Sequence, residues 1–415
     1  MKKIAIIGAG ISGLSAGYYL SRKYEVSLFE KESRLGGHTH TINVDSSVGQ
    51  IPVDTGFIVH NTRTYPNLIR LLSELGVETQ ASDMSFSVSH KKTDFEYSSR
   101  GTNGFFAQRS NFLNPQHYLL LKEILRFNRQ SLELLDNPQG DNVTLGEYME
   151  AKHFGQRFRE FYLYPMASAV WSTSLEKILD FPAATLIRFF DNHGMLGINT
   201  NPEWRVIKGG SNTYIKPLGA PFKERIFTGQ NLLAVTRTDA GVKLTFDNKE
   251  LWFDEVVFAC HGNQILPLLP EATETERDVL KNFQTSRNET VLHTDSKILP
   301  RNQKARASWN YQVNETSLKG TTLTYHMNRL QSLAAKEDYC VSLNTNGTID
   351  KSTVLRNLVY HHPLYTREAI RAQQQWSEIS GKNHTHFCGA YWFYGFHEDG
   401  LNSALRVART MGIEC

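Results

Sequence analysis

The sequence predicts an α/β protein in which a parallel sheet for nucleotide binding is interleaved with a second, α+β region. Three observations predict this fold: a buried strand followed by spaced glycines at the start of the chain, another buried strand over residues 255–260, and alternating strands between residues 273 and 365. A chain of 415 residues is too long for one ordinary core. Two closely joined domains are therefore expected.

The first element is a strand over residues 2–7 that lacks polar alternation, as strands covered on both faces do. A G-x-G-x-x-G motif follows and leads into a helix; the motif comprises Gly8, Gly10, Ile11, Ser12 and Gly13. Its first glycine allows a tight turn, its second lets the backbone approach a pyrophosphate, and its third lets helix and strand pack closely. The unpaired N–H groups at the helix N-terminus favour the anion.

A second strand over residues 25–29 ends at Glu30, and Glu30 and the following Lys31 are candidate cofactor-binding residues. An acid at this place accepts the ribose hydroxyls, and its charge repels a 2′-phosphate. Strand, glycines, helix, strand and acid in this order predict a Rossmann dinucleotide site.

The segment Arg34-Leu35-Gly36-Gly37 resembles the second FAD signature of the amine oxidase and phytoene desaturase flavoproteins. The segment 53–57 (VDTGF) resembles the part of that superfamily that runs beside the isoalloxazine. The resemblance implies non-covalently bound FAD and a glutathione-reductase-like Rossmann domain with an interleaved, amine-oxidase-like substrate domain. The cofactor contacts it implies here are Arg34, Gly36, Gly37, His38, Thr55, Gly56 and Phe57.

Further cofactor contacts are implied by the same resemblance at two later places in the chain. A backbone position matching Leu232 contacts adenine in that superfamily, and the strand end at Ala259 and Cys260 lies near the cofactor. Segment 389–401 resembles the closing motif, in which a glycine-rich turn precedes a final helix, expected here over residues 400–411 with Asp399 as its N-cap. The implied contacts of this motif are Glu398, Asp399, Gly400 and Leu401.

Two interleaved domains follow from these motifs. Residues 1–75, 201–270 and 380–415 are expected to form the FAD-binding domain, with a small antiparallel meander near residues 232–253. Residues 76–200 are expected to be the mostly helical part of the substrate domain, and residues 271–379 its mixed sheet. The aromatic side chains of residues 148–190 fit an acyl-chain tunnel, although aromatic stripes on helices more often form core.

Longer strings resemble one subfamily more closely: residues 52–61 (PVDTGFIVHN), 323–331 (LTYHMNRLQ) and 395–401 (GFHEDGL). They are similar to predicted oxidoreductases found beside, or in plants fused to, cyclopropane-fatty-acid synthases. The resemblance implies an oxidase or desaturase that transfers hydride from a hydrophobic, fatty-acyl lipid substrate to flavin N5. Oxygen or another acceptor would then reoxidise the flavin.

Candidate catalytic residues are His397, His361 and Phe396. The histidines can accept a proton while the flavin takes the hydride. Phe396 matches one ring of the aromatic pair with which amine oxidases hold their substrate. Two H-x-H pairs, at residues 38–40 and 384–386, have no third ligand nearby, so no metal site is expected.

Two alternatives to the lipid oxidoreductase stay open. One is a flavin amine oxidase, and the other is a non-redox or non-catalytic user of the same fold. The intact glycine motifs argue against a chaperone that has lost its flavin site. A sugar mutase would need a dense cluster of arginines that the sequence lacks.

Net charge and cysteine content limit the classes of partner and the cellular compartment that the sequence predicts. A net charge of +3 with interspersed signs predicts no nucleic-acid partner. The four cysteines form no CxxC pair, and no segment is long and apolar enough to span a bilayer, which predicts a cytoplasmic protein. Peripheral contact with the inner face of a membrane stays open, and the oligomeric state does not follow from the sequence.

Overall fold

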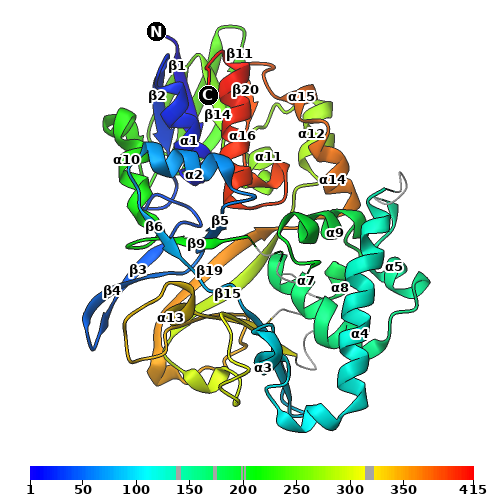
Figure 1. Cartoon of the computed structure of the whole chain (residues 1–415). Helices are drawn as coiled ribbons and strands as arrows, with labels where there is room; N and C mark the ends of the chain where they lie inside the picture. The colour runs from blue at the N-terminus through cyan, green and yellow to red at the C-terminus, as the bar shows by residue number, and fades with distance from the viewer. Residues whose placement is uncertain (137–141, 172–174, 198–199, 201, 314–321) are drawn as a thin grey trace.

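A five-stranded parallel sheet in the order β10-β2-β1-β14-β20 forms the centre of the upper lobe in Figure 1. The computed structural model describes residues 1–136, 142–171, 175–197, 200, 202–313 and 322–415. Neighbouring strands of this sheet all run parallel, which confirms the predicted sheet. The strands are β1 (Lys3–Ile7), β2 (Glu25–Phe29), β10 (Ile226–Phe227), β14 (Glu255–Phe258) and β20 (Thr385–Phe387).

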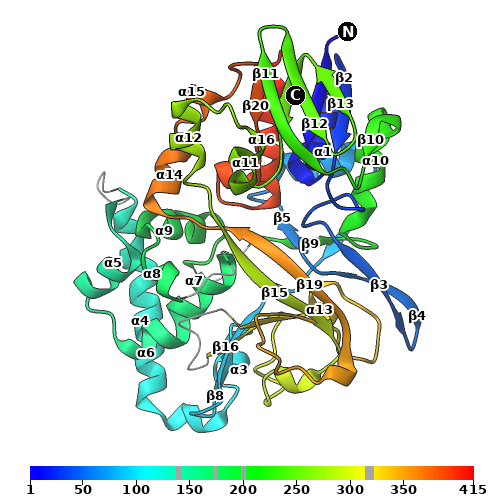
Figure 2. The ribbon, with the colours of Figure 1, turned by 180° about the vertical axis from the view of Figure 1, so that it is seen from behind.

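Helices cover one face of this sheet, and the predicted meander covers the other (Figure 2). The helices are α1 (Ile11–Leu20) and α16 (His397–Thr410), with α2 (Pro66–Glu74) alongside. The meander consists of β11 (Leu232–Thr238), β12 (Gly241–Phe246) and β13 (Glu250–Phe253), paired antiparallel as predicted. Both chain ends lie in this lobe (Figure 1).

The last helix begins earlier than predicted. It starts at His397 rather than Gly400, so Asp399 lies inside its first turn and is not the N-cap. The Asp399 carboxylate instead accepts a hydrogen bond from the Phe396 backbone N–H at 2.9 Å. A Cβ atom on Gly400 would lie 2.6 Å from Ile11 Cγ2, so the glycine lets α16 pack tightly against α1.

A seven-stranded sheet in the order β19-β15-β18-β17-β16-β7-β8 forms the lower lobe. All its neighbours are antiparallel except β16 and β7. Figure 2 shows β15 and β19 as a long pair that runs down from the upper lobe. The strands are β7 (Phe86–His90), β8 (Phe95–Ser98), β15 (Thr285–His293), β16 (Trp309–Val313), β17 (Leu323–His326), β18 (Cys340–Leu343) and β19 (Val354–Pro363).

Helices pack beside this sheet and enclose a second core (Figure 1). They include α4 (Pro115–Gln130), α5 (Leu145–Ala151), α7 (Tyr164–Trp171), α8 (Leu175–Leu179) and α9 (Ala183–Asn192). The segment expected to be mostly helical therefore opens with strands, because β7 and β8 complete the edge of the mixed sheet. The predicted division into two domains stays a prediction, and residue 201 at one of its boundaries lies outside the described residues.

Short strands join the lobes. β5 (Val59–Asn61) and β6 (Thr79–Ala81) both pair with β9 (Trp204–Ile207), and β3 (Thr41–Ser46) pairs with β4 (Gly49–Asp54). Within the described parts of the chain, no helix combines the length and hydropathy needed to cross a membrane.

A buried carboxylate ties these connecting segments together. Asp54 is fully buried at the end of β4 and accepts hydrogen bonds from the Ser211 N–H (2.9 Å) and the Ser211 hydroxyl (2.8 Å). Gln331 Nε2 and Thr41 Oγ1 also donate to it, at 3.0 and 2.5 Å. Three distant stretches of chain therefore meet at one side chain.

We expect Asp54→Ala to lower the free energy of unfolding by roughly 3 kcal/mol, because four donors would lose their buried acceptor. Urea denaturation followed by circular dichroism measures the change. Asp45→Ala, on the neighbouring strand but exposed, is the matched control and should shift stability by less than about 0.5 kcal/mol. Equal effects of the two substitutions would contradict the role of Asp54.

Candidate functional site

A cavity of about 1080 Å³ runs between the two lobes. It exceeds the roughly 300–1,000 Å³ of ordinary small-molecule pockets, so it has room for a dinucleotide and a substrate together. One end is formed by the carboxyl ends of β1, β2 and β14. The other end lies between α7, α9, β7 and β16.

The predicted glycine motif forms the turn between β1 and α1 at the first end. Gly8 has φ +106°, which side chains rarely adopt, and a Cβ on Gly13 would lie 1.9 Å from the Gly8 carbonyl oxygen. Among the described residues, no atom lies within 4 Å of a Cβ built on Gly10, because that position faces the cavity. No described side chain caps the N-terminus of α1, which leaves N–H groups for an anion.

Glu30 and the Arg34–Gly37 segment lie beside this turn. Glu30 Oε2 accepts a hydrogen bond from the Ala9 N–H at 2.7 Å. The Gly36 N–H donates to the Ala9 carbonyl at 2.8 Å, and a Cβ on Gly37 would lie 3.1 Å from Gly10 Cα. The structure therefore brings together the two glycine segments and the acid, which are separated in the sequence. Lys31 and Arg34 also line the cavity.

The remaining cofactor candidates divide into two groups. Those that line the cavity are Ile11, Ser12, His38, Gly56, Phe57, Leu232, Ala259 and Cys260. Those that lie behind its wall are Gly13, Thr55, Glu398, Asp399, Gly400 and Leu401. Glu398, for example, accepts hydrogen bonds from the Asn67 and Leu68 N–H groups at 3.0 and 2.8 Å, and so holds the first turn of α2.

His397 is buried and engaged with protein groups. Its Nε2 lies 2.8 Å from Thr39 Oγ1 and 3.0 Å from the Tyr214 hydroxyl, and its ring stacks on Phe57 with centroids 3.5 Å apart. Burial lowers the pKa of His397 to about 3. The ring is therefore neutral at physiological pH, and it orders the loop that carries Phe57.

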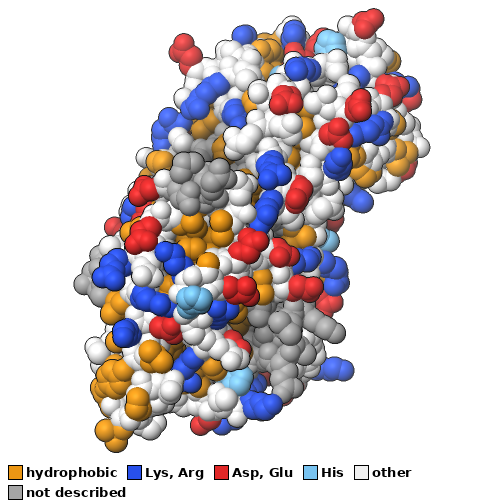
Figure 3. Space-filling view, turned by 90° about the vertical axis from the view of Figure 1, so that its right-hand side faces the viewer, with side chains coloured by type: hydrophobic (Ala, Val, Ile, Leu, Met, Phe, Trp, Pro, Cys, Tyr) orange, Lys and Arg blue, Asp and Glu red, His pale blue; other side chains and the backbone are white. Residues whose placement is uncertain are grey.

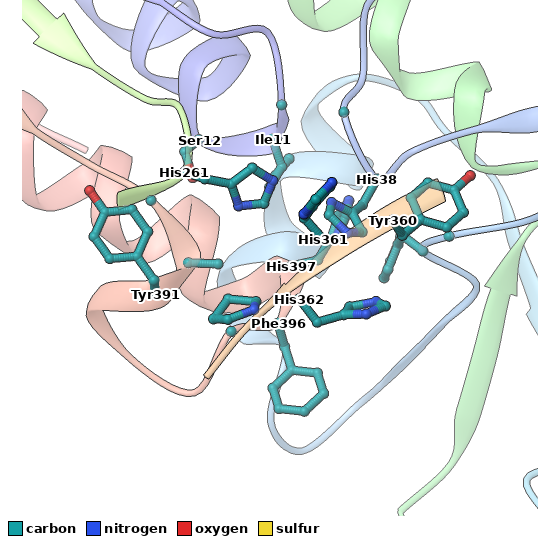
Figure 4. A pocket seen from close by; sticks show the side chains of 18 of the residues that line it. Ile11, Ser12, His38, His261, Tyr360, His361, His362, Tyr391, Phe396 and His397 are labelled. Carbon is teal, nitrogen blue, oxygen red and sulfur yellow. The ribbon is translucent and has the colours of Figure 1, made fainter. Parts of the chain in front are cut away.

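The other two catalytic candidates also line the cavity. His361 is exposed on β19, and Figure 4 shows it among other imidazoles. Phe396 stacks on Phe189 with centroids 4.9 Å apart and 21° between the planes. This is ordinary contact stacking, and an amine would not fit between these two rings.

His261 and His362 are cavity residues that the sequence did not indicate. The His38 ring centroid lies 5.7 Å from that of His261 and 5.3 Å from that of His362, and the three come from separate segments of the chain (Figure 4). Burial lowers the pKa of His261 and of His362 to about 4, and that of His38 well below its usual range. The middle of the cavity thus carries neutral imidazoles. The sequence signal that could have identified His261 is its place directly after Ala259 and Cys260, at the end of strand β14.

Aromatic and aliphatic side chains line the far end, which we call the apolar chamber. Of the aromatic residues between 148 and 190, only Trp171 and Phe189 reach it, and the others form the helical core among the described residues. The described part of its wall carries no Asp, Glu, Lys or Arg. The chamber is lined by Met84, Ser85, Phe86, Met166, Ala169, Val170, Trp171, Phe189, His193, Met195, Trp204, Trp309, Tyr325, Tyr365, Tyr394 and Phe396.

These residues fit an FAD. The open face of Gly10, the α1 N-terminus and Arg34 suit a pyrophosphate, and Glu30 suits a ribose. A model of the flavin containing amine oxidoreductase family matches residues 11–364. The chain belongs to this family. The match confirms the predicted superfamily, the FAD cofactor and the class of FAD-dependent oxidoreductases.

Two curated relatives of this flavin oxidoreductase match only in part. Protoporphyrinogen oxidase 2 of Arabidopsis thaliana is 28% identical over 193 residues, which are 44% of this chain and 35% of the relative. The 1-hydroxycarotenoid 3,4-desaturase of Flavobacterium sp. (strain P99-3) is 31% identical over 151 residues, which are 36% of this chain and 26% of the relative. The matched segments thus span about a third of these relatives or less.

A solved structure of a putrescine oxidase double mutant superimposes with a TM-score of 0.72. The superposition covers 99% of this chain and 98% of that one, at 13% sequence identity. The likeness confirms the amine-oxidase-like fold predicted for the flavin oxidoreductase and carries no information on its substrate.

We expect Gly10→Ala to weaken FAD binding by at least roughly tenfold while the fold is kept, because the added methyl points into the cavity rather than into protein. Titration of the flavin-free protein with FAD measures the affinity, and thermal unfolding of that protein reports the fold. Gly146→Ala, within α5 and away from the cavity, should bind FAD as the wild type does. Unchanged FAD affinity in Gly10→Ala would show that the pyrophosphate lies elsewhere.

His397 also predicts a loss of stability in acid. Its pKa is about 3 when folded and about 6.5 when unfolded, so the unfolded chain binds more protons between these values. The stability that the neutral His397 ring contributes is therefore fully present above about pH 6.5 and is lost as the pH drops toward 3. His397→Gln should remove up to about 2 kcal/mol of the difference between about pH 7 and about pH 5. Urea midpoints of both proteins at the two pH values measure this, and parallel losses would contradict it.

Proposed function

We propose that this protein oxidises or desaturates a hydrophobic, fatty-acyl lipid substrate. The observation that carries the proposal is the apolar chamber, whose described wall holds no charged side chain. An acyl chain loses no ionic partner there and gains burial worth roughly 0.8 kcal/mol for each CH₂ group. The carotenoid desaturase among the relatives supports a hydrophobic substrate for this sequence type.

The cavity offers separate places for cofactor and substrate. The chemistry that FAD would supply here is acceptance, at N5, of a hydride from a substrate C–H bond. The residues of the chamber hold the chain and exclude water, while Trp171 Nε1 donates to the Tyr394 carbonyl at 3.3 Å and fixes two of its walls. Glu30 and Arg34 line the opposite end and would hold the nucleotide there.

Desaturation also requires a base for the second hydrogen, which leaves as a proton when the C=C bond forms. We assign this role to His361 rather than His397. Nε2 of His397 is occupied by Thr39 and Tyr214, whereas His361 is exposed on the cavity wall. Oxygen or another acceptor would take up the electron pair that leaves the substrate.

Amine oxidation is the second candidate, because the matching family model describes flavin containing amine oxidoreductases. Two features count against it. An ammonium group would find no carboxylate in the described wall of the chamber. The ring of Phe396 is in contact with Phe189, so these two rings do not form an open aromatic cage.

The proposed substrate also bears on location. Acyl chains of membrane lipids lie within a bilayer, and a protein that acts on them must approach its surface. We therefore propose peripheral contact with the inner face of a membrane for a protein that otherwise works in the cytoplasm.

Anaerobic mixing of the FAD-loaded protein with a dispersed phospholipid should bleach the visible flavin absorbance, because the substrate hydride reduces the flavin. Mass spectrometry of the lipid should find a product that has lost two hydrogens. Putrescine and cyclohexylamine serve as amine probes under the same conditions. Bleaching by amines and not by lipid would establish the second candidate and overturn the first.

A charge in the chamber tests where the substrate lies. Met166→Lys, on α7, should raise KM for the acyl substrate at least tenfold, by roughly the cost of burying an ammonium against it, and leave the flavin spectrum unchanged. Leu355→Lys, which is exposed on β19 outside the cavity lining, is the matched control and should behave as the wild type.

A further inference from the structure

Helix α4 presents an unusual surface to solvent. Its buried side chains, His117, Leu120 and Phe127, face the helical core. On the opposite side, an exposed stripe follows spacings of three and four residues, which place its members on one face. On α4 the stripe consists of Tyr118, Leu119, Lys122, Leu125 and Arg129, and Leu132 continues it in the 3₁₀ turn Ser131–Leu134 that follows.

The apolar members of this stripe continue onto the turn before α4. Phe112 is 45% exposed and Leu113 is 90% exposed, the largest value among the non-terminal large hydrophobic side chains of the described chain. Figure 3 shows hydrophobic side chains gathered at the lower end of this side of the molecule, with Lys and Arg side chains above them. Residues 112–132 hold six exposed large hydrophobic side chains in all.

Basic charge dominates the same surface. Lys122 and Arg129 are exposed within the stripe, and the Arg109 guanidinium lies 5.8 Å from the centre of the Phe112 ring. The single acid of α4, Glu123, is turned away: its side chain is 13% exposed and accepts a hydrogen bond from the Gly155 N–H. Nearby Glu133 lies 3.5 Å from Lys152 and is balanced by it.

The combination of apolar and basic side chains on this surface distinguishes between two partners, a second copy of the chain and a membrane. A second copy of the chain docked through the same face about a two-fold axis would set Lys122 and Arg129 against like charges. An anionic lipid surface complements them, because leucine and aromatic side chains enter the acyl boundary while lysine and arginine reach the headgroups. The alternation of apolar and basic residues along one stripe is the pattern of such interfacial helices.

We propose that α4 and the turns on either side of it, residues 109–132, form a docking surface for an anionic membrane. The inference deepens the proposed function and rests on it for its purpose, since a protein that acts on acyl chains of membrane lipids must approach a bilayer. The surface itself is defined without reference to the substrate. It lies in the lower lobe, away from the glycine motif and the parallel sheet (Figure 1).

Sedimentation with vesicles tests the proposal on the full chain loaded with FAD. Vesicles of phosphatidylcholine mixed with phosphatidylglycerol should bind the protein, and vesicles of phosphatidylcholine alone should bind it more weakly, with binding to the former falling as salt is raised. Replacement of Leu113, Leu119 and Leu125 together by serine should reduce the bound fraction at least about tenfold. Lys122→Gln combined with Arg129→Gln should remove the preference for anionic vesicles.

Leu233→Ser combined with Trp252→Ser is the matched control, because these side chains are also exposed, at 47% and 56%, but lie on the meander of the upper lobe. It should bind vesicles as the wild type does. An unchanged flavin spectrum shows that each variant is folded. Flavin bleaching by a soluble short-chain acyl substrate should be the same in the wild type and the leucine variant, so failure of docking and failure of the proposed reaction are separable.

Three outcomes would overturn the docking surface. They are a wild-type protein that sediments with neither kind of vesicle, a leucine variant that binds as well as the wild type, and a control variant that loses binding equally. A fourth outcome that would overturn it comes from light scattering without lipid. If the wild type is a dimer that dissociates in the leucine variant, this face joins two copies of the chain.

Discussion

The cavity depends on one close approach of backbone to backbone. The first turn of α1 lies so near the end of β1 that a Cβ on Gly13 would meet the Gly8 carbonyl at 1.9 Å, and a Cβ on Gly8 would meet Ala259 at 3.0 Å. Only glycine permits this packing. It brings the N-terminus of α1 to the carboxyl ends of the strands, where anions bind in parallel sheets. Gly400, near the other end of the chain, likewise allows close packing, because it leaves room for the Ile11 side chain.

Buried carboxylates hold the segments that surround this contact between α1 and β1. Glu398 holds the first turn of α2 against α16, and Asp54 gathers Ser211 and Gln331 from distant parts of the chain. Each carboxylate is satisfied by several donors, so its burial is tolerated and its removal is costly. The cavity lies between lobes held by such contacts, which is a common location for ligand sites.

The sequence predicts those elements that carry a local pattern, but it does not predict which strands from distant segments pair. The parallel strands, the glycine turn and the meander each carry their own short pattern, and the structure has all three. The order of the seven-stranded sheet depends on β7 pairing with β16, more than 200 residues away, which no local pattern encodes. His261 and His362 were missed for the same reason, since they become neighbours of His38 only through the fold. Asp399 was misplaced because α16 starts one turn earlier than its glycine indicates.

The polarity of the cavity changes in one direction, and this order constrains its ligands more strongly than any single residue does. Glu30, Lys31 and Arg34 give one end fixed charges, which suit the ribose and phosphate groups of a nucleotide. Burial keeps the imidazoles of the middle neutral, so they can donate or accept hydrogen bonds without placing a charge beside the reacting atoms. The far end offers hydrocarbon and aromatic surface. A substrate that bears a charge would therefore lose its hydration without compensation in the described chamber, whereas a neutral acyl chain would not.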